Sequence, residues 1–188
     1  MPIEQCNEEI VLKVTQDQRQ ELAKFYRQIE QRAFRMANIE TRNASDALDL
    51  VQDAMESLMK RYSHHSIEEW KPLFYRILQN RIKDWHRWSG LRAKLHLKKS
   101  SGDGHDEPEY QVASSELSPI DQADQDLTMD KLQHALNQLS FRQRQTVLLR
   151  VWEGFNVEET ASIMKCSQGS VKTHLSRALT SLKTLLEE

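Results

Sequence analysis

The chain has 188 residues, which is enough for one ordinary domain or two small ones. Hydrophobic residues make up 38% and charged residues 29%, with five Gly and four Pro, which favours a soluble, helix-rich protein over a β-sandwich or a disordered chain. No apolar run approaches the roughly 18 residues of a membrane span, and the acidic N-terminus lacks the pattern of a signal peptide. The two cysteines, Cys6 and Cys166, cannot form a disulfide framework or a four-ligand zinc site. We therefore expect a cytoplasmic protein that does not insert into the membrane.

The net charge of −2 hides an uneven distribution. Residues 1–99 hold 18 bases and 14 acids, residues 100–127 hold no base and eight acids, and residues 128–188 hold eight bases and six acids. The middle stretch mixes its acids with Gly, Pro and Ser, which is the composition of a linker extended by charge repulsion. We predict an N-terminal tail over 1–15, two small helical domains over 16–99 and 128–188, and a flexible acidic linker over 100–127. The linker is either a plain tether or a strap with a binding site of its own.

The predicted fold class is all-α, because apolar residues recur at steps of three and four and no strand pattern competes. In the first domain we predict three helices. The first spans 16–36, the second begins after Ser45 as its N-cap, and the third spans 67–89 with Pro72 in its first turn. In the second domain we predict helices over 128–139, 141–153, 157–164 and 167–186.

The segment 156–186 has the pattern of a DNA-binding helix-turn-helix. Asn156 and Ser167 are expected to cap its two helices, with a turn at 164–166. One side of the second helix is apolar, namely Val171, Leu175, Ala178, Leu182 and Leu186. The other side is small, hydroxylated or basic, and no acid occurs between Glu159 and Glu187. A solvated face usually mixes both charge signs, so this face predicts a helix that lies in a major groove.

Two further surfaces are expected in the first domain. Asp46, Asp49 and Asp53 recur at helical spacing, and such an acidic face is either solvated or docks against a basic partner. Residues 71–99 hold nine bases and one acid interleaved with aromatic residues, a mixture that suits single-stranded nucleic acid. Trp70, Phe74 and Trp85 are expected in the core, whereas Trp88 could be core or stacking platform.

These motifs together resemble the bacterial RNA polymerase sigma factors. The segment LSFRQRQTVLLRVWEGFNVEETASIMKCSQGSVKTHLSRALTSLK resembles their region four, and the strings SDALDLVQDAMESL and WKPLFYRILQNRIKDWHRW resemble parts of region two. Gln79, Ser140, Lys165 and His174 depart from the family, which usually has Arg, Pro, Gly and Arg there. The two-domain size is similar to that of the extracytoplasmic-function (ECF) group.

The resemblance implies three sets of site residues. Region four would bind the flap of the polymerase β subunit and read the minus-thirty-five promoter element through Ser170, Val171, Lys172, Thr173, His174, Ser176 and Arg177. Region two would grip the clamp helices of the β′ subunit through Asp46, Asp49, Leu50, Gln52 and Asp53. It would capture a flipped base and open the minus-ten element through Tyr62, His64, His65, Asn80, Lys83, Asp84, Arg87 and Trp88.

The function implied is that of an alternative sigma factor, whose partners are core RNA polymerase, promoter DNA and an anti-sigma factor, without cofactor or catalytic residue. A stand-alone helix-turn-helix regulator is the alternative, and it predicts a dimer on a palindromic site. A helical metal-dependent enzyme would need His64, His65, His86 or His96 to converge with acids, and the H-E-x-x-H signature is absent. Two adjacent histidines without a third ligand make a poor metal site, so no metal is expected.

Overall fold

The structure is a computed structural model that describes residues 16–96 and 131–187, so the predicted tail and acidic linker lie outside the described residues. Within these two ranges every regular element is a helix, which confirms the all-α prediction. No helix in the described ranges is long and apolar enough to cross a membrane. The chain divides into two compact units, with one described range in each.

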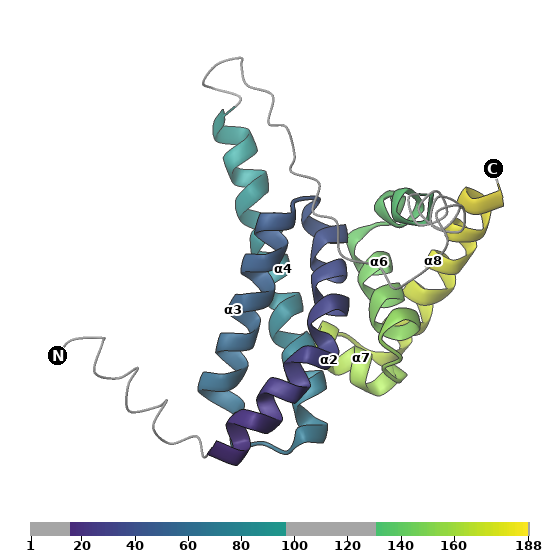
Figure 1. Cartoon of the computed structure of the whole chain (residues 1–188). Coiled ribbons are helices and arrows are strands. Elements are labelled where there is room, and N and C mark those ends of the chain that lie inside the picture. Colours follow the sequence, from purple (N-terminus) through teal and green to yellow (C-terminus); the bar gives the residue numbers. More distant parts are fainter. Residues whose placement is uncertain (1–15, 97–130, 188) are drawn as a thin grey trace, which may run out of the picture. The chain divides into compact units, whose positions relative to one another are not determined.

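The first unit is built from three helices that pack against one another, α2 (Gln16–Thr41), α3 (Ala44–Tyr62) and α4 (Ile67–His96) (Figure 1). Apolar residues at steps of three and four along α2 are all buried, namely Leu22, Phe25, Ile29, Ala33 and Met36. The ring of Phe25 lies 5.8 Å from that of Trp70 and 6.3 Å from that of Phe74, between centroids. Trp70 and Phe74 are therefore core residues, as predicted.

Two local predictions in this unit were wrong. The N-cap of α3 is Asn43, whose side chain accepts from the Asp46 N–H at 2.9 Å, so Ser45 already lies inside the helix. The reason is Arg42, whose φ of 53° turns the chain early and leaves Asn43 extended. Pro72 is the sixth residue of α4 and not part of its first turn, so the carbonyl of Glu68 has no N–H four residues ahead.

The second unit begins its described part with helical residues 131–138, followed by α6 (Phe141–Val147), η1 (Leu148–Trp152), α7 (Val157–Met164) and α8 (Gln168–Glu187). The single helix predicted over 141–153 is only partly right, because it widens into the π-helix η1, where the Glu153 N–H bonds the carbonyl of Leu148. The core of this unit is formed by large apolar residues, including Leu148, Leu149, Phe155, Ile163 and Met164.

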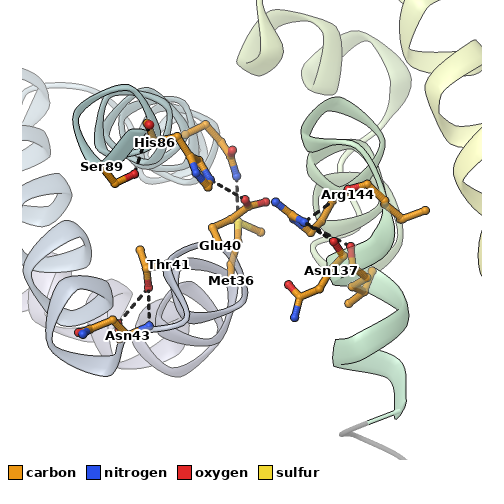
Figure 2. Close-up of polar contacts among 11 residues, drawn as sticks. Met36, Glu40, Thr41, Asn43, His86, Ser89, Asn137 and Arg144 are labelled. Carbon is orange, nitrogen blue, oxygen red and sulfur yellow. Dashed lines mark hydrogen bonds and ion pairs between the residues drawn. The ribbon is translucent and has the colours of Figure 1, made fainter. Parts of the chain in front are cut away.

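The side chains of Arg144 and Gln143 order the start of α6. The guanidinium Nη1 of Arg144 lies 3.4 Å from the carbonyl oxygens of Leu136 and Asn137, at the end of the preceding helix (Figure 2). The backbone N–H of Ser140 donates to Gln143 Oε1 at 3.1 Å. A proline, which the resemblance leads one to expect at position 140, has no N–H for this bond.

Candidate nucleic-acid interface

The two helices of the helix-turn-helix begin at the caps that the sequence predicts. Asn156 Oδ1 accepts from the Glu159 N–H at 2.8 Å, and the Glu159 carboxylate accepts from the Asn156 N–H at 2.7 Å. Ser167 Oγ accepts from the Ser170 N–H at 3.1 Å. These bonds satisfy N–H groups that a helix start would otherwise leave without partners, so α7 and α8 have defined first turns.

The turn between α7 and α8 depends on one backbone conformation and one long-range hydrogen bond. Lys165 is left-handed, with φ 53° and ψ 54°, at the position where the family often has glycine. Arg142 Nη1, from the start of α6, donates to the carbonyl of Met164 at 3.0 Å. Sequence reasoning missed Arg142, because its partner is 22 residues away and no local pattern marks it.

The side of α8 opposite the core carries the exposed residues Lys172, Thr173, Ser176, Arg177 and Thr180. None of them is acidic. Within the described residues Lys172 and Arg177 make no ion pair. The Thr173 and Thr180 hydroxyls donate to carbonyls of their own helix at 3.0 Å, which leaves their oxygen lone pairs as acceptors. Ser170 and His174 are half-buried at the flanks of this face. We refer to Lys172, Thr173, Ser176, Arg177 and Thr180 as the α8 face.

Two predictions on α8 need correction. Val171 was placed among the DNA-contacting residues, but its side chain is 0% exposed and packs in the core with Ala178. Leu186 was placed on the apolar stripe, yet it is 49% exposed, whereas Leu182, one turn earlier, is buried. Val171 therefore supports the helix from inside.

The loop between α3 and α4 brings together rings that the sequence singled out. The Tyr62 and His65 ring centroids are 5.4 Å apart, and those of His64 and His65 are 4.6 Å apart. The guanidinium of Arg76, a residue not predicted, lies 5.9 Å over the Tyr62 ring. The Trp70 indole N–H donates to the Tyr62 carbonyl at 3.1 Å and fixes the end of α3.

Glu69 orders the start of α4 beside this loop. Its carboxylate accepts from the Ser66 N–H at 3.1 Å and lies 3.3 Å from His65 Nδ1. The Ser66 hydrogen bond, helped by His65, lowers the pKa of Glu69, so this carboxylate is anionic at neutral pH. Among the described residues, no group of three or more His, Cys, Asp and Glu side chains could hold a metal ion.

Further along α4, the predicted minus-ten residues Asp84, Arg87 and Trp88 are exposed, while Asn80 and Lys83 are half-buried. Asp84 and Arg87 pair at 3.2 Å on the surface. Trp88 is 62% exposed, so its ring is available for stacking. Trp85 is instead half-buried, and its indole N–H donates to Asp46 at 3.0 Å.

Gln79, where the family usually has arginine, is buried. Its amide Nε2 lies 3.1 Å from Met36 Sδ (Figure 2). This position therefore packs α4 against α2.

The acidic surface predicted on α3 is only partly assembled. Asp49, Gln52 and Asp53 are exposed together. Leu48 is 39% exposed beside them, whereas Leu50, predicted to contact the polymerase, is 9% exposed and packs inward. We refer to Asp49, Gln52 and Asp53 as the α3 face.

Arg81 lies beside this surface and was not predicted. Its guanidinium is 3.8 Å from Asp53 and donates to Ser57 Oγ at 3.1 Å. It thus joins α4 to α3 across the edge of the α3 face.

Comparison with known proteins identifies both units. The sigma-70 region 2 family matches residues 22–90, and the sigma-70 region 4 family matches residues 129–182. The chain is 32% identical over 145 residues to the RNA polymerase sigma-E factor of Streptomyces antibioticus, covering 76% of this chain and 71% of that protein. It is 30% identical over 166 residues to the ECF RNA polymerase sigma factor SigM of Mycobacterium tuberculosis, covering 86% and 74%. Among solved structures, the chain is similar to the sigma factor RpoE in complex with the anti-sigma factor NepR from Bartonella quintana. The sequence identity is 25% and the TM-score is 0.67, and the match covers 92% of this chain and 98% of that one.

Proposed function

We infer the roles of these surfaces from one premise: the chain belongs to the sigma-70 family, in its ECF group, and is an alternative sigma factor that directs transcription initiation. The observation that carries the proposal is that residues matching region 2 and region 4 expose different chemistry. One unit exposes an acidic face together with an aromatic and basic helix end, and the other exposes an acid-free helix.

We propose that the α8 face reads the minus-thirty-five element, with Ser170 and His174 at its edges. Lys172 and Arg177 supply donors for phosphates and base edges, and the hydroxyls of Thr173 and Ser176 supply short polar contacts. Val171 contributes through its packing, which fixes the rotation of α8 about its axis.

The minus-ten element is proposed to contact the C-terminal half of α4 and the loop between α3 and α4. Exposed Trp88 offers a stacking surface, while Lys83 and Arg87 attract the backbone and Asn80 and Asp84 offer hydrogen bonds. A base that leaves the duplex needs a pocket with aromatic or polar walls, and the ring cluster of Tyr62, His64 and His65 provides such side chains. Duplex opening driven by binding energy requires no cofactor and no catalytic residue.

Core RNA polymerase is proposed to bind the α3 face through its β′ subunit, and the second unit through its β subunit. Exposed carboxylates at Asp49 and Asp53 suit a basic partner surface. Leu50 supports this face from the core. The structure of RpoE contains an anti-sigma factor, which supports the proposal that such a protein also binds this chain.

The test is transcription in vitro with purified chain, core polymerase and a template library randomised at both promoter elements. Enriched sequences at both elements, only when core and chain are both present, are expected. Arg177→Ala should weaken discrimination at one position of the minus-thirty-five element, by roughly 1–3 kcal/mol, whereas Lys24→Ala, an exposed base on α2, should not. No association with core at physiological salt would refute the proposal.

The same preparation separates this function from that of a stand-alone regulator. A regulator that uses the second unit alone would dimerise and retard a palindromic DNA site without core. We expect no specific complex with promoter DNA until core polymerase is added.

A further inference from the structure

Two consecutive side chains in the C-terminal half of α4 bond to two different helices. Trp85 Nε1 donates to Asp46 Oδ2 on α3 at 3.0 Å, and His86 Nε2 lies 2.9 Å from Glu40 Oε2 on α2. Figure 2 shows the His86 contact with Glu40 beside the α2–α3 turn. Glu40 and Asp46 stand on either side of that turn, so α4 is held at the place where α2 ends and α3 begins.

The α2–α3 turn is itself ordered by side-chain hydrogen bonds. Thr41 Oγ1 donates to the Asn43 carbonyl at 2.9 Å, and the Asn43 N–H lies 3.2 Å from the same hydroxyl (Figure 2). Asn43 Oδ1 then accepts from the Asp46 N–H at 2.9 Å. Asp46 is therefore fixed twice, through its backbone by Asn43 and through its carboxylate by Trp85.

These bonds occur just beyond the last fully buried apolar residue among the described side chains of α4. Ile82 is fully buried, but residues 83–89 are all half-buried or exposed. Arg87 and Trp88, which are proposed to meet the opening strand, lie directly after Trp85 and His86. The direction of this stretch relative to α2 and α3 thus depends on polar contacts from Trp85 and His86.

We propose that Trp85 and Asp46 form a positioning pair, which holds the C-terminal half of α4 so that Arg87 and Trp88 contact the opened promoter strand. On this assignment Asp46 acts within the chain and is not a polymerase contact. Asp49 and Asp53, one and two turns further along α3, belong to the α3 face, so the pair also joins the polymerase-binding helix to the strand-opening helix. The inference rests on the proposed sigma-factor function.

The experiment measures two quantities for each variant of the full chain. One is its affinity for core polymerase, and the other is open-complex formation on a duplex promoter, followed by permanganate reactivity of unpaired thymines. Asp46→Ala and Trp85→Phe should each keep core affinity within about twofold and reduce open-complex formation about tenfold, the scale of one charge-assisted hydrogen bond. The double variant should be no worse than either single variant, because both remove the same bond.

Asp46→Asn separates the two roles of this side chain, since it removes the charge but keeps an oxygen that accepts from the indole. Because the remaining hydrogen bond is neutral and weaker, Asp46→Asn should recover only part of the opening that Asp46→Ala loses. Asp49→Asn is the matched control and should lower core affinity.

Three results would overturn the inference: loss of core affinity in Asp46→Asn equal to that in Asp49→Asn, full additivity in the double variant, or normal opening by both single variants. If the unchanged chain fails to bind core, the sigma-factor proposal fails first and the pair loses its role. If Trp85→Phe does not fold, the comparison of Asp46→Ala with Asp46→Asn still decides.

Discussion

Replacing Val171 by alanine tests the correction made to the DNA-reading helix. The Val171 side chain is 0% exposed, so Val171→Ala removes two methyl groups from a closed core. Lost transfer of two carbons is worth about 1.6 kcal/mol, and a cavity that does not collapse brings the loss to about 2–3 kcal/mol. A domain of this size has about 3–9 kcal/mol of stability in total, so the change is large.

The assay is urea unfolding of the full chain, with hydrogen exchange of α7 and α8 peptides to localise the loss to the second unit. Folded Val171→Ala should keep the same minus-thirty-five preference as wild type. Thr173→Ala, an exposed neighbour on the α8 face, should show the reverse, with stability changed by less than about 0.5 kcal/mol and the preference altered. A stable Val171→Ala protein with altered base preference would refute the reasoning and return Val171 to the DNA contact.

Three further predictions follow from single residues. Burial raises the pKa of Tyr26 to about 12 from 10.0, so the folded state holds this proton more tightly, and its contribution to stability is complete below pH 10 and lost as pH rises toward 12. Urea midpoints across this range should fall less steeply for Tyr26→Phe, which also lacks the 2.6 Å bond to the Met55 carbonyl; parallel curves would contradict this. Lys165→Gly should raise the free energy of unfolding by up to about 1 kcal/mol, because glycine adopts the left-handed conformation without strain, and a lower value would show that the lysine side chain stabilises the turn. Lys172→Ala should reduce by about one the slope of log affinity of the polymerase complex for promoter DNA against log salt, and an unchanged slope would mean that Lys172 meets no phosphate.

Local rules predicted those parts of the fold whose causes are local. Helix α7 occurs at the residues predicted, because Asn156 and Glu159 cap its start within the segment itself. The start of α3 was misplaced because both Asn43 and Ser45 can cap a helix, and the conformation of Arg42 decides between them. The π-helix η1 has no local signature, since the hydrogen bond from Glu153 to Leu148 spans five residues and competes with the ordinary bond over four.

The sequence predicted the exposure of the candidate site residues correctly where that exposure follows the helical period, and incorrectly where a motif was taken as a continuous string. Val171 lies between Ser170 and Lys172, and Leu50 lies between Asp49 and Val51, so each entered a site with its neighbours. A helix turns 100° per residue, so a run of seven residues covers its whole circumference and must include some that face the core. Applying the period would have excluded Val171, which already lies on the apolar side of its helix, whereas Leu50 shares its buried face mainly with the small residues Ala47 and Ala54, which mark that face weakly in the sequence.

The Trp85–Asp46 bond shows what the period cannot supply. Its two partners are 39 residues apart, and each alone fits a different prediction: Trp85 a core residue, Asp46 a polymerase contact. The packing of α3 against α4 brings the two side chains together. The half-buried Trp85 indole, with its N–H already bonded, is neither a core residue nor a ring free to stack on a base. The Asp46 carboxylate that accepts this bond is a weaker candidate than Asp49 for a contact with the polymerase. Asp49 and Trp88 are exposed, and within the described residues no such contact occupies them, so both stay candidates for the roles proposed above. Sequence patterns therefore predict the faces of this sigma factor, and tertiary contacts decide which members of each face are available to a partner.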